Sequence, residues 1–175
     1  MTNTSLIVDL DHTLINTDLL FESSITLIKR NPFTLFAIPF WLIKGMANLK
    51  QKIADRVDLD IKKLPYNKKV IEYINIRKSA GDNIILATAS HYKYANQVAN
   101  YLNIFDGVLA TDAKFNLSSH NKAKELVRIY GEKNFDYIGD HKRDIPVWDV
   151  SNIAILVNVK PQVENKLSNI KKIKI

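Results

Sequence analysis

The sequence predicts a Rossmann-like open α/β fold, in which a parallel sheet lies between two helical layers in a three-layer α/β/α arrangement. Short apolar runs rich in β-branched residues alternate with longer stretches of helical periodicity, as in chains whose parallel strands are joined by crossover helices. Several apolar runs contain no polar position, which is typical of strands covered on both faces. Open sheets of this kind bind ligands beyond the carboxyl ends of their strands, so functional residues are expected there.

The expected elements follow one another in simple alternation. Strands are predicted at residues 5–9, 83–88, 107–110, 136–138 and 153–158. Apolar residues at helical spacing predict helices around residues 70–74, 95–102 and 123–130. Ser90 and Ser119 are candidate N-caps, and Gly81 and Gly131 stand where helices would end.

One segment interrupts the alternation. Residues 19–65 show helical periodicity without a strand, punctuated by Pro32, Pro39 and Gly45. We interpret this segment as a small helical cap inserted into a core of residues 1–160. The lysine-rich residues 161–175 are expected to form a basic tail, either a terminal helix or a linker.

The composition is that of one globular domain. The chain has 175 residues, no cysteine and a net charge of +7. The absence of cysteine excludes disulfides and a thiol nucleophile and suits a cytoplasmic location. The positive charge favours anionic partners, but no nucleic-acid-binding motif accompanies it, so no specific nucleic acid is expected. The most apolar stretch, residues 33–43, is too short to cross a bilayer, which takes about 20 residues.

The strongest chemical signal is the sequence DLDHT after the first strand. Residues two apart in an extended chain point to one side, which makes the carboxylates of Asp9 and Asp11 neighbours. Two adjacent carboxylates repel unless a cation or a proton intervenes, and Mg²⁺ prefers oxygen ligands. The alternative is an Asp-rich turn, which is common after strands.

A second signal, Thr88-Ala89-Ser90, ends the second predicted strand before a helix. A hydroxyl group and successive backbone N–H groups at that position form a cradle for an anion. Helix capping would by itself explain Ser90, whereas Thr88 is polar among apolar neighbours and needs another reason.

The remaining two signals lie on the later strands and helices. Lys122, in the first turn of a predicted helix, is disfavoured by the helix dipole unless it faces anions; a solvated helix face is the alternative. Gly139-Asp140 follows an apolar strand, with Asp144 one helical turn later, so both carboxylates can reach one metal ion. A turn followed by an N-cap would also explain this pattern.

In their order and positions the four motifs resemble those of the haloacid dehalogenase (HAD) superfamily: DLDHTL, TAS, Lys122 and GDHKRD. The resemblance extends from residue 5 to about residue 158 and implies a HAD-like fold with a cap after the first strand. Asp11, two residues after Asp9, is typical of the phosphatases and mutases in this superfamily and argues against a dehalogenase. His12 stands where glycine is frequent, and no role is assigned to it.

The resemblance implies a Mg²⁺-dependent phosphomonoester hydrolase. Asp9 would be the nucleophile that becomes an aspartyl-phosphate, and Asp11 would serve as acid and then as base. Mg²⁺ would be bound by Asp9, the backbone carbonyl of Asp11, Asp140 and, directly or through water, Asp144. The catalytic and phosphate-binding groups would include Thr88, Ala89, Ser90 and Lys122. His91, His120 and His141 lack the spacing of a zinc site and are expected at the surface.

A finer resemblance concerns residues 17–23, 31–45, 64–67 and 139–148. These segments (TDLLFES, NPFTLFAIPFWLIKG, LPYN and GDHKRDIPVW) are similar to the HAD domain that is fused to membrane prenyltransferases of the UbiA type. The sequence departs from those proteins by having no transmembrane helices, so it is expected to be a piece of such a protein, a stand-alone relative or a domain joined to something else. This departure weighs against a lipid-pathway substrate and leaves the expected chemistry unchanged.

The cap carries more large apolar residues than one helix face can bury. They are Phe33, Leu35, Phe36, Ile38, Phe40, Trp41, Leu42 and Ile43. Exposed, they would contact a membrane surface, a lipid or a partner protein, and place the protein at the periphery of a membrane. Alternatively the cap is a helical hairpin that packs on itself. The expected substrate is a small or lipid-linked phosphate; the alternatives are a phosphoprotein such as a phosphotyrosine protein, and a non-catalytic phosphate-binding or docking module.

Overall fold

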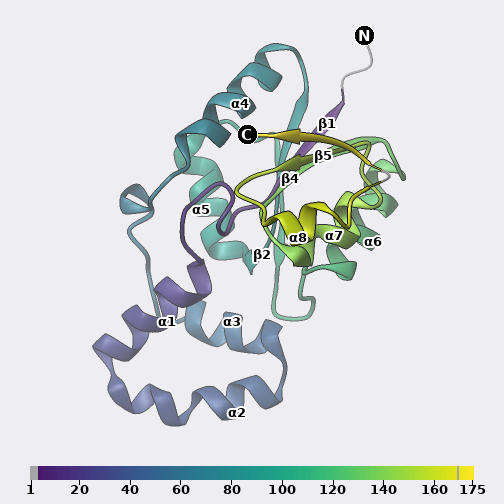
Figure 1. The fold of residues 1–175 in the computed structure, drawn as a ribbon. Coiled ribbons are helices and arrows are strands. Elements are labelled where there is room, and N and C mark those ends of the chain that lie inside the picture. The colour runs from purple at the N-terminus through teal and green to yellow at the C-terminus, as the bar shows by residue number, and fades with distance from the viewer. Residues whose placement is uncertain (1–3, 169) are drawn as a thin grey trace.

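A computed structural model describes residues 4–168 and 170–175 of the chain. The described residues form one parallel sheet with the strand order β3-β2-β1-β4-β5-β6 (Figure 1). The strands are β1 (Ser5–Val8), β2 (Asn83–His91), β3 (Gly107–Thr111), β4 (Phe135–Gly139), β5 (Ile153–Leu156) and β6 (Lys171–Lys174). The open α/β fold is confirmed, and all five predicted strands are present.

Helices cover both faces of the sheet, which divides the core in two. Leu6 and Val8 of β1 point into one apolar cluster and Ile7 into the other, following the alternation of a strand. Helices α4 (Lys68–Ser79) and α5 (Tyr92–Leu102) pack on the first face, and α6 (His120–Tyr130) and α7 (Ile145–Trp148) on the second. The strands are therefore buried on both sides, as their uniformly apolar sequences predict.

The predicted helix ends are confirmed in part. Gly81, after α4, has φ of 94°, and Gly131, which ends α6, has φ of 86°, a region that glycine adopts without strain. The prediction that Ser90 caps α5 is wrong, because β2 continues through Ser90 and the ring of His91 accepts the backbone N–H of Lys93 instead. Ser119 occupies the N-cap position of α6, but its side chain makes no capping hydrogen bond.

The C-terminal segment is neither a long helix nor a linker. It contains the short helix α8 (Pro161–Glu164) and then β6, which pairs in parallel with β5. Ile173 and Ile175 pack against the first core cluster, and this alternation in the sequence KKIKI is the strand signal that lysine content obscured. Residues 1–3 of the predicted core and residue 169 of the predicted tail lie outside the described residues.

The chain between β1 and α4 carries the segment predicted as the cap, residues 19–65. Its elements are α1 (Leu19–Arg30), the 3₁₀ helix η1 (Pro32–Phe36), α2 (Ile38–Ile43), α3 (Met46–Ala54) and the 3₁₀ helix η2 (Ile61–Lys63). A small apolar cluster of its own holds the cap together. Figure 1 shows α2 at the far end of this lobe, with α1 and α3 between it and the sheet.

Candidate active site

The residues predicted to act together gather at the carboxyl ends of three neighbouring strands. Asp9 follows β1, Asp140 follows β4, and Ser90 lies at the end of β2. Because β1 stands between β2 and β4, this is where the strand order reverses, the position at which open α/β sheets bind ligands. A pocket of about 260 Å³ opens there, and the cap contributes Leu20, Met46 and Lys50 to its wall.

Three carboxylates meet at the floor of this pocket. Asp9, Asp140 and Asp144 each offer an oxygen, and these oxygens lie within 4.8 Å of one another. Burial, together with Asp144 and Asp11, raises the pKa of Asp9 to about 8 although Lys122 opposes the shift. Burial and Asp144 raise the pKa of Asp140 to about 6. Carboxylates so close and so buried need protons or a cation, and an all-oxygen donor set fits Mg²⁺.

The cluster is held by hydrogen bonds from the loop after β4 and from Thr13, which follows β1. One carboxylate oxygen of Asp144 accepts the backbone N–H groups of Asp140, at 3.3 Å, and of His141, at 3.1 Å. The hydroxyl group of Thr13 donates to Asp140 at 3.2 Å. The carboxylates are therefore oriented before any cation binds.

Asp11 points away from the three clustered carboxylates. One of its side-chain oxygens accepts the backbone N–H of Leu19, at 2.9 Å, and the other accepts the hydroxyl group of Ser90, at 2.6 Å. Burial raises the pKa of Asp11, and Asp18 adds to the shift. A carboxyl group with a raised pKa beside the pocket suits the predicted proton donor, and its side chain is separate from the predicted metal ligands.

Lys122 is buried rather than solvated. Its ammonium group lies 2.6 Å from a carboxylate oxygen of Asp9, 2.8 Å from the hydroxyl oxygen of Tyr137 and 3.9 Å from Asp144. Burial alone would lower the pKa of Lys122, but Asp9 and Asp144 outweigh it, so that the net shift is upward and the side chain stays charged. The structure thus brings together the two residues that the sequence separates by 113 positions.

The second motif, Thr88-Ala89-Ser90, lies partly in the pocket wall and partly in the protein interior. Ala89 and Ser90 line the pocket, and their contact with phosphate stays a prediction. Thr88 is fully buried and is not among the lining residues; its hydroxyl oxygen accepts the backbone N–H of Ser90 at 2.9 Å. In this structure Thr88 thus shapes the turn, and its direct contact with phosphate stays a prediction.

Tyr137 and Lys50 are among the polar residues of the site that sequence reasoning missed. Tyr137, fully buried in β4, donates its hydroxyl proton to Asp144, at 2.7 Å, and accepts from Lys122. A tyrosine within an apolar strand was the available signal, because a buried hydroxyl group needs a partner. Lys50, on cap helix α3, donates to the carbonyl oxygen of Ala89 at 2.6 Å and to the Asn116 side chain at 2.8 Å.

The histidines are placed in different environments. His120 and His141 are exposed, as predicted, but the prediction for His91 is wrong: it is buried, and its Nε2 lies 2.8 Å from the side-chain oxygen of Gln51 in the cap. His12 has φ of 59°, a left-handed conformation that favours glycine, which accounts for the glycine frequent at this position in the family it resembles.

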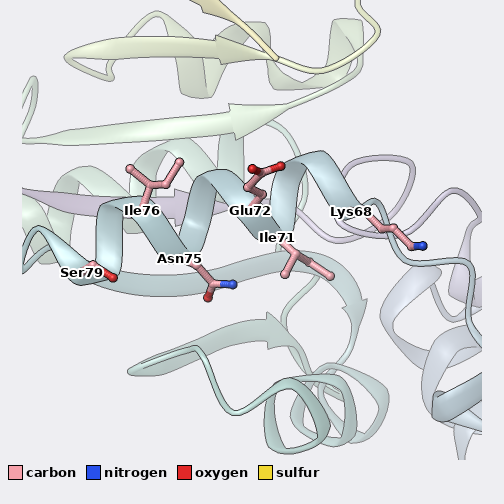
Figure 2. A pocket seen from close by; sticks show the side chains of 6 residues that line it. All are labelled: Lys68, Ile71, Glu72, Asn75, Ile76 and Ser79. Atoms are coloured by element: carbon pink, nitrogen blue, oxygen red, sulfur yellow. The ribbon is translucent and has the colours of Figure 1, made fainter.

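A second hollow, of about 560 Å³, runs along the outer side of α4 (Figure 2). Its lining side chains all come from that helix: Lys68, Ile71, Glu72, Asn75, Ile76 and Ser79. It contains a single carboxylate and none of the predicted site residues. The chemistry therefore belongs to the pocket at the strand ends.

Comparison with known proteins shows the fold. No protein-family model matches the chain. An uncharacterized protein from Sinorhizobium fredii (strain NBRC 101917 / NGR234) is 34% identical over 163 residues, which are 93% of this chain. The chain spans only 31% of the length of that relative.

Several solved structures share the architecture over nearly the whole chain. A substrate-bound phosphoserine phosphatase has a TM-score of 0.66 at 17% identity, covering 99% of this chain and 93% of its own. A phospho-aspartyl intermediate analogue of phosphoserine phosphatase has a TM-score of 0.64 at 17% identity, covering 99% and 94%. A HAD family hydrolase from Salmonella enterica serovar Typhi has a TM-score of 0.65 at 15% identity, covering 98% and 68%. The chain therefore has the HAD-like α/β fold.

Proposed function

We propose that this chain is a Mg²⁺-dependent phosphomonoester hydrolase that acts through an aspartyl-phosphate on Asp9. One observation carries the proposal: a carboxylate oxygen of Asp9 lies 2.6 Å from the buried ammonium group of Lys122, and Asp9 also belongs to the cluster with Asp140 and Asp144. A structural ion pair would need one carboxylate beside the lysine. Here Asp9 and Asp144 both lie within 4 Å of the lysine and share a cluster with Asp140, which suggests a site that holds a divalent cation and an anion together.

The reaction would proceed in two steps. Asp9 attacks the phosphorus atom and forms an acyl-phosphate while the bond to the leaving oxygen breaks and Asp11 gives that oxygen a proton. Asp11 then takes a proton from the water that attacks the aspartyl-phosphate, which releases phosphate and restores Asp9. Lys122, Thr88, Ala89 and Ser90 would contact the phosphoryl oxygens. Mg²⁺, held by Asp9, Asp140 and Asp144 and by the backbone carbonyl of Asp11, would neutralise negative charge that develops on the phosphoryl group.

The compared structures support this chemistry by their own descriptions. Phosphoserine phosphatase has this fold and is described with its substrate and as a phospho-aspartyl intermediate analogue. The pocket of about 260 Å³ favours a small headgroup, so a small metabolite or a lipid-linked phosphate is the substrate class that we propose ahead of a phosphoprotein. The similarity to HAD domains fused to UbiA-type prenyltransferases supports the lipid-linked member of that class, and the absence of cysteine suits a cytoplasmic location.

The decisive experiment is hydrolysis of p-nitrophenyl phosphate with Mg²⁺ and with excess chelator. Asp9→Asn should abolish turnover, whereas the matched variant Asp149→Asn, at an exposed position outside the pocket, should retain it. A screen of sugar phosphates, prenyl phosphates and phosphopeptides would then rank the substrate classes. Turnover that survives in Asp9→Asn would refute the nucleophile, and failure of the wild-type chain on every substrate would favour the non-catalytic alternative.

A further inference from the structure

The outer side of the cap exposes an unusual number of large apolar side chains. Six of them lie on η1 and α2, and we call these six the apolar cap face: Phe33, Leu35, Phe36, Phe40, Leu42 and Ile43. Phe33 is 77% exposed, Phe36 74%, Phe40 70% and Ile43 81%. Single exposed apolar residues are ordinary, but this density within eleven consecutive residues marks an interaction surface.

These side chains are not left over from an incomplete cap core. Ile38 and Trp41, from the same segment, turn inward and pack on the cluster formed by Leu27, Leu49, Ile53 and Val57. The guanidinium group of Arg56 lies over the Trp41 ring at 4.9 Å. The hairpin therefore packs on itself with two of its eight large apolar residues and presents the other six outward.

The charged side chains of residues 23–54, which include the apolar cap face, are all positive. From residue 23 to residue 54 the chain contains no Asp or Glu, whereas it contains Lys29, Arg30, Lys44, Lys50 and Lys52. Lys29 and Arg30 are exposed at the end of α1, and Lys44 is exposed directly after α2. Exposed cations thus flank the apolar cap face at both ends in sequence, with no carboxylate between them.

We propose that the apolar cap face and its flanking cations bind the surface of an anionic lipid bilayer. Aromatic and aliphatic side chains would enter the headgroup boundary while Lys29, Arg30 and Lys44 contact lipid phosphates. A protein partner would have to supply all the negative charge itself, whereas an anionic leaflet supplies it at every point. Among the described residues no helix combines the length and apolarity needed to cross a membrane.

The position of the cap gives this binding a consequence for the site. Helix α2 lies at the far end of the cap (Figure 1), and α3 begins at Met46, which lines the pocket three residues after Ile43. Docking through α2 would therefore place α1 and α3 between the bilayer and the sheet, and α3, which carries Met46 and Lys50, would connect the docked face to the pocket where a lipid-linked phosphate would bind. This consequence rests on the proposed function, whereas the docking itself does not.

Flotation of the purified full chain with vesicles tests the docking without any catalytic readout. The vesicles are phosphatidylcholine alone and phosphatidylcholine with about a quarter phosphatidylglycerol. The wild-type chain should float with the anionic vesicles, and Ile43→Asp should weaken that binding at least about tenfold. The matched variant Ile76→Asp, on α4 (Figure 2) and 62% exposed, should bind like wild type. Lys44→Gln should weaken binding to the anionic vesicles by about fivefold.

Three results would overturn the proposal. The first is no binding of the wild-type chain to either vesicle, and the second is equal loss in Ile43→Asp and Ile76→Asp. The third is a concentration-dependent oligomer in gel filtration that Ile43→Asp dissolves while vesicles remain unbound, which would assign the face to a protein partner. Circular dichroism of both variants establishes that they are folded. Because none of these measurements involves phosphate hydrolysis, an inactive chain that still binds vesicles would count against the proposed function alone.

Discussion

The ammonium group of Lys50, carried by cap helix α3, lies 2.6 Å from the carbonyl oxygen of Ala89 in core strand β2. Its second hydrogen-bond partner, the side-chain oxygen of Asn116 at 2.8 Å, is also neutral. The residue is only 7% exposed, and burial lowers the pKa of Lys50 although Asp11 and Asp18 oppose the shift. Burying an ammonium group whose hydrogen-bond acceptors are neutral costs free energy unless an anion also pairs with the ammonium group. We interpret Lys50 as a cap residue placed to contact the substrate's phosphate.

The first prediction follows from this contact. Lys50→Met should raise the KM for p-nitrophenyl phosphate by about ten- to a hundredfold, because one charge-assisted hydrogen bond is lost. Lys50→Arg should recover part of the loss. Lys52→Met, two residues along the same helix and outside the pocket lining, is the matched control and should leave KM unchanged. A lowered melting temperature with unchanged KM in Lys50→Met would show that the residue only fastens the cap to the core.

The second prediction concerns Tyr137, whose hydroxyl group joins Lys122 to Asp144. Tyr137→Phe keeps the ring in the core but removes a hydrogen bond from each of these two residues. Because groups that orient metal ligands typically contribute about 10–100-fold, we expect a fall of that size in kcat or in the apparent affinity for Mg²⁺. Tyr130→Phe, in which the altered hydroxyl group is half-buried on α6, provides the control. Steady-state kinetics against Mg²⁺ concentration would decide, and an unchanged Mg²⁺ dependence together with unchanged kcat would contradict this role.

The third prediction concerns the lack of a side chain at Gly139. A Cβ atom added there would lie 2.8 Å from a carboxylate oxygen of Asp144 and 2.9 Å from the Tyr137 ring. Gly139→Ala should therefore displace Asp144 and lower both Mg²⁺ affinity and turnover. At Gly107 in β3 an added Cβ would meet only the terminal methyl group of Ile85, at 3.0 Å, which can move. Gly107→Ala should accordingly lower stability slightly and leave activity unchanged. Titration calorimetry measures the Mg²⁺ affinity of both variants. An equal loss of affinity in the two would contradict the role of Gly139 in making room for Asp144.

The same residues show how far the sequence could predict the site. The strand-end carboxylates were predictable, because strand composition and the position of Asp9 and Asp140 after apolar runs are local patterns. Lys122 alone was a weak signal, and its prediction as a site residue depended on the order of the four motifs. The contact between Lys50 and Ala89 spans 39 residues and depends on how the cap docks, which no local pattern encodes. The sequence shows Gly139 only as the residue before Asp140, whereas the structure shows that it makes room for Asp144.

The apolar residues of the cap show the same limit of prediction from sequence. Composition predicted that some of them stay exposed, but not which. Trp41, the largest of them, would have been the natural residue to mutate in a membrane-binding test, yet it packs inward under Arg56. Ile43 and Phe40 are two of the six residues that stay exposed. Helical periodicity fails here because α2 has only six residues and lies between two turns.

The last prediction concerns pH and the three clustered carboxylates. Without a cation, burial raises the pKa of Asp9 to about 8 and that of Asp140 to about 6, so these two groups hold more protons in the folded chain than in the unfolded chain above about pH 4. Their contribution to the free energy of unfolding in chelator should therefore fall as pH rises from about 5 to about 8.

Mg²⁺ requires the deprotonated carboxylates, so its apparent affinity should rise over the same interval and its binding should release protons. Asp9→Asn removes the group with the higher pKa and should flatten the loss of stability toward pH 8, while Asp149→Asn should follow the wild type. Melting temperatures of the three proteins at several pH values, with chelator and with Mg²⁺, test this directly. A wild-type chain whose stability in chelator rises toward pH 8 relative to Asp9→Asn would mean that Asp9 is already ionised beside Lys122 before any cation arrives.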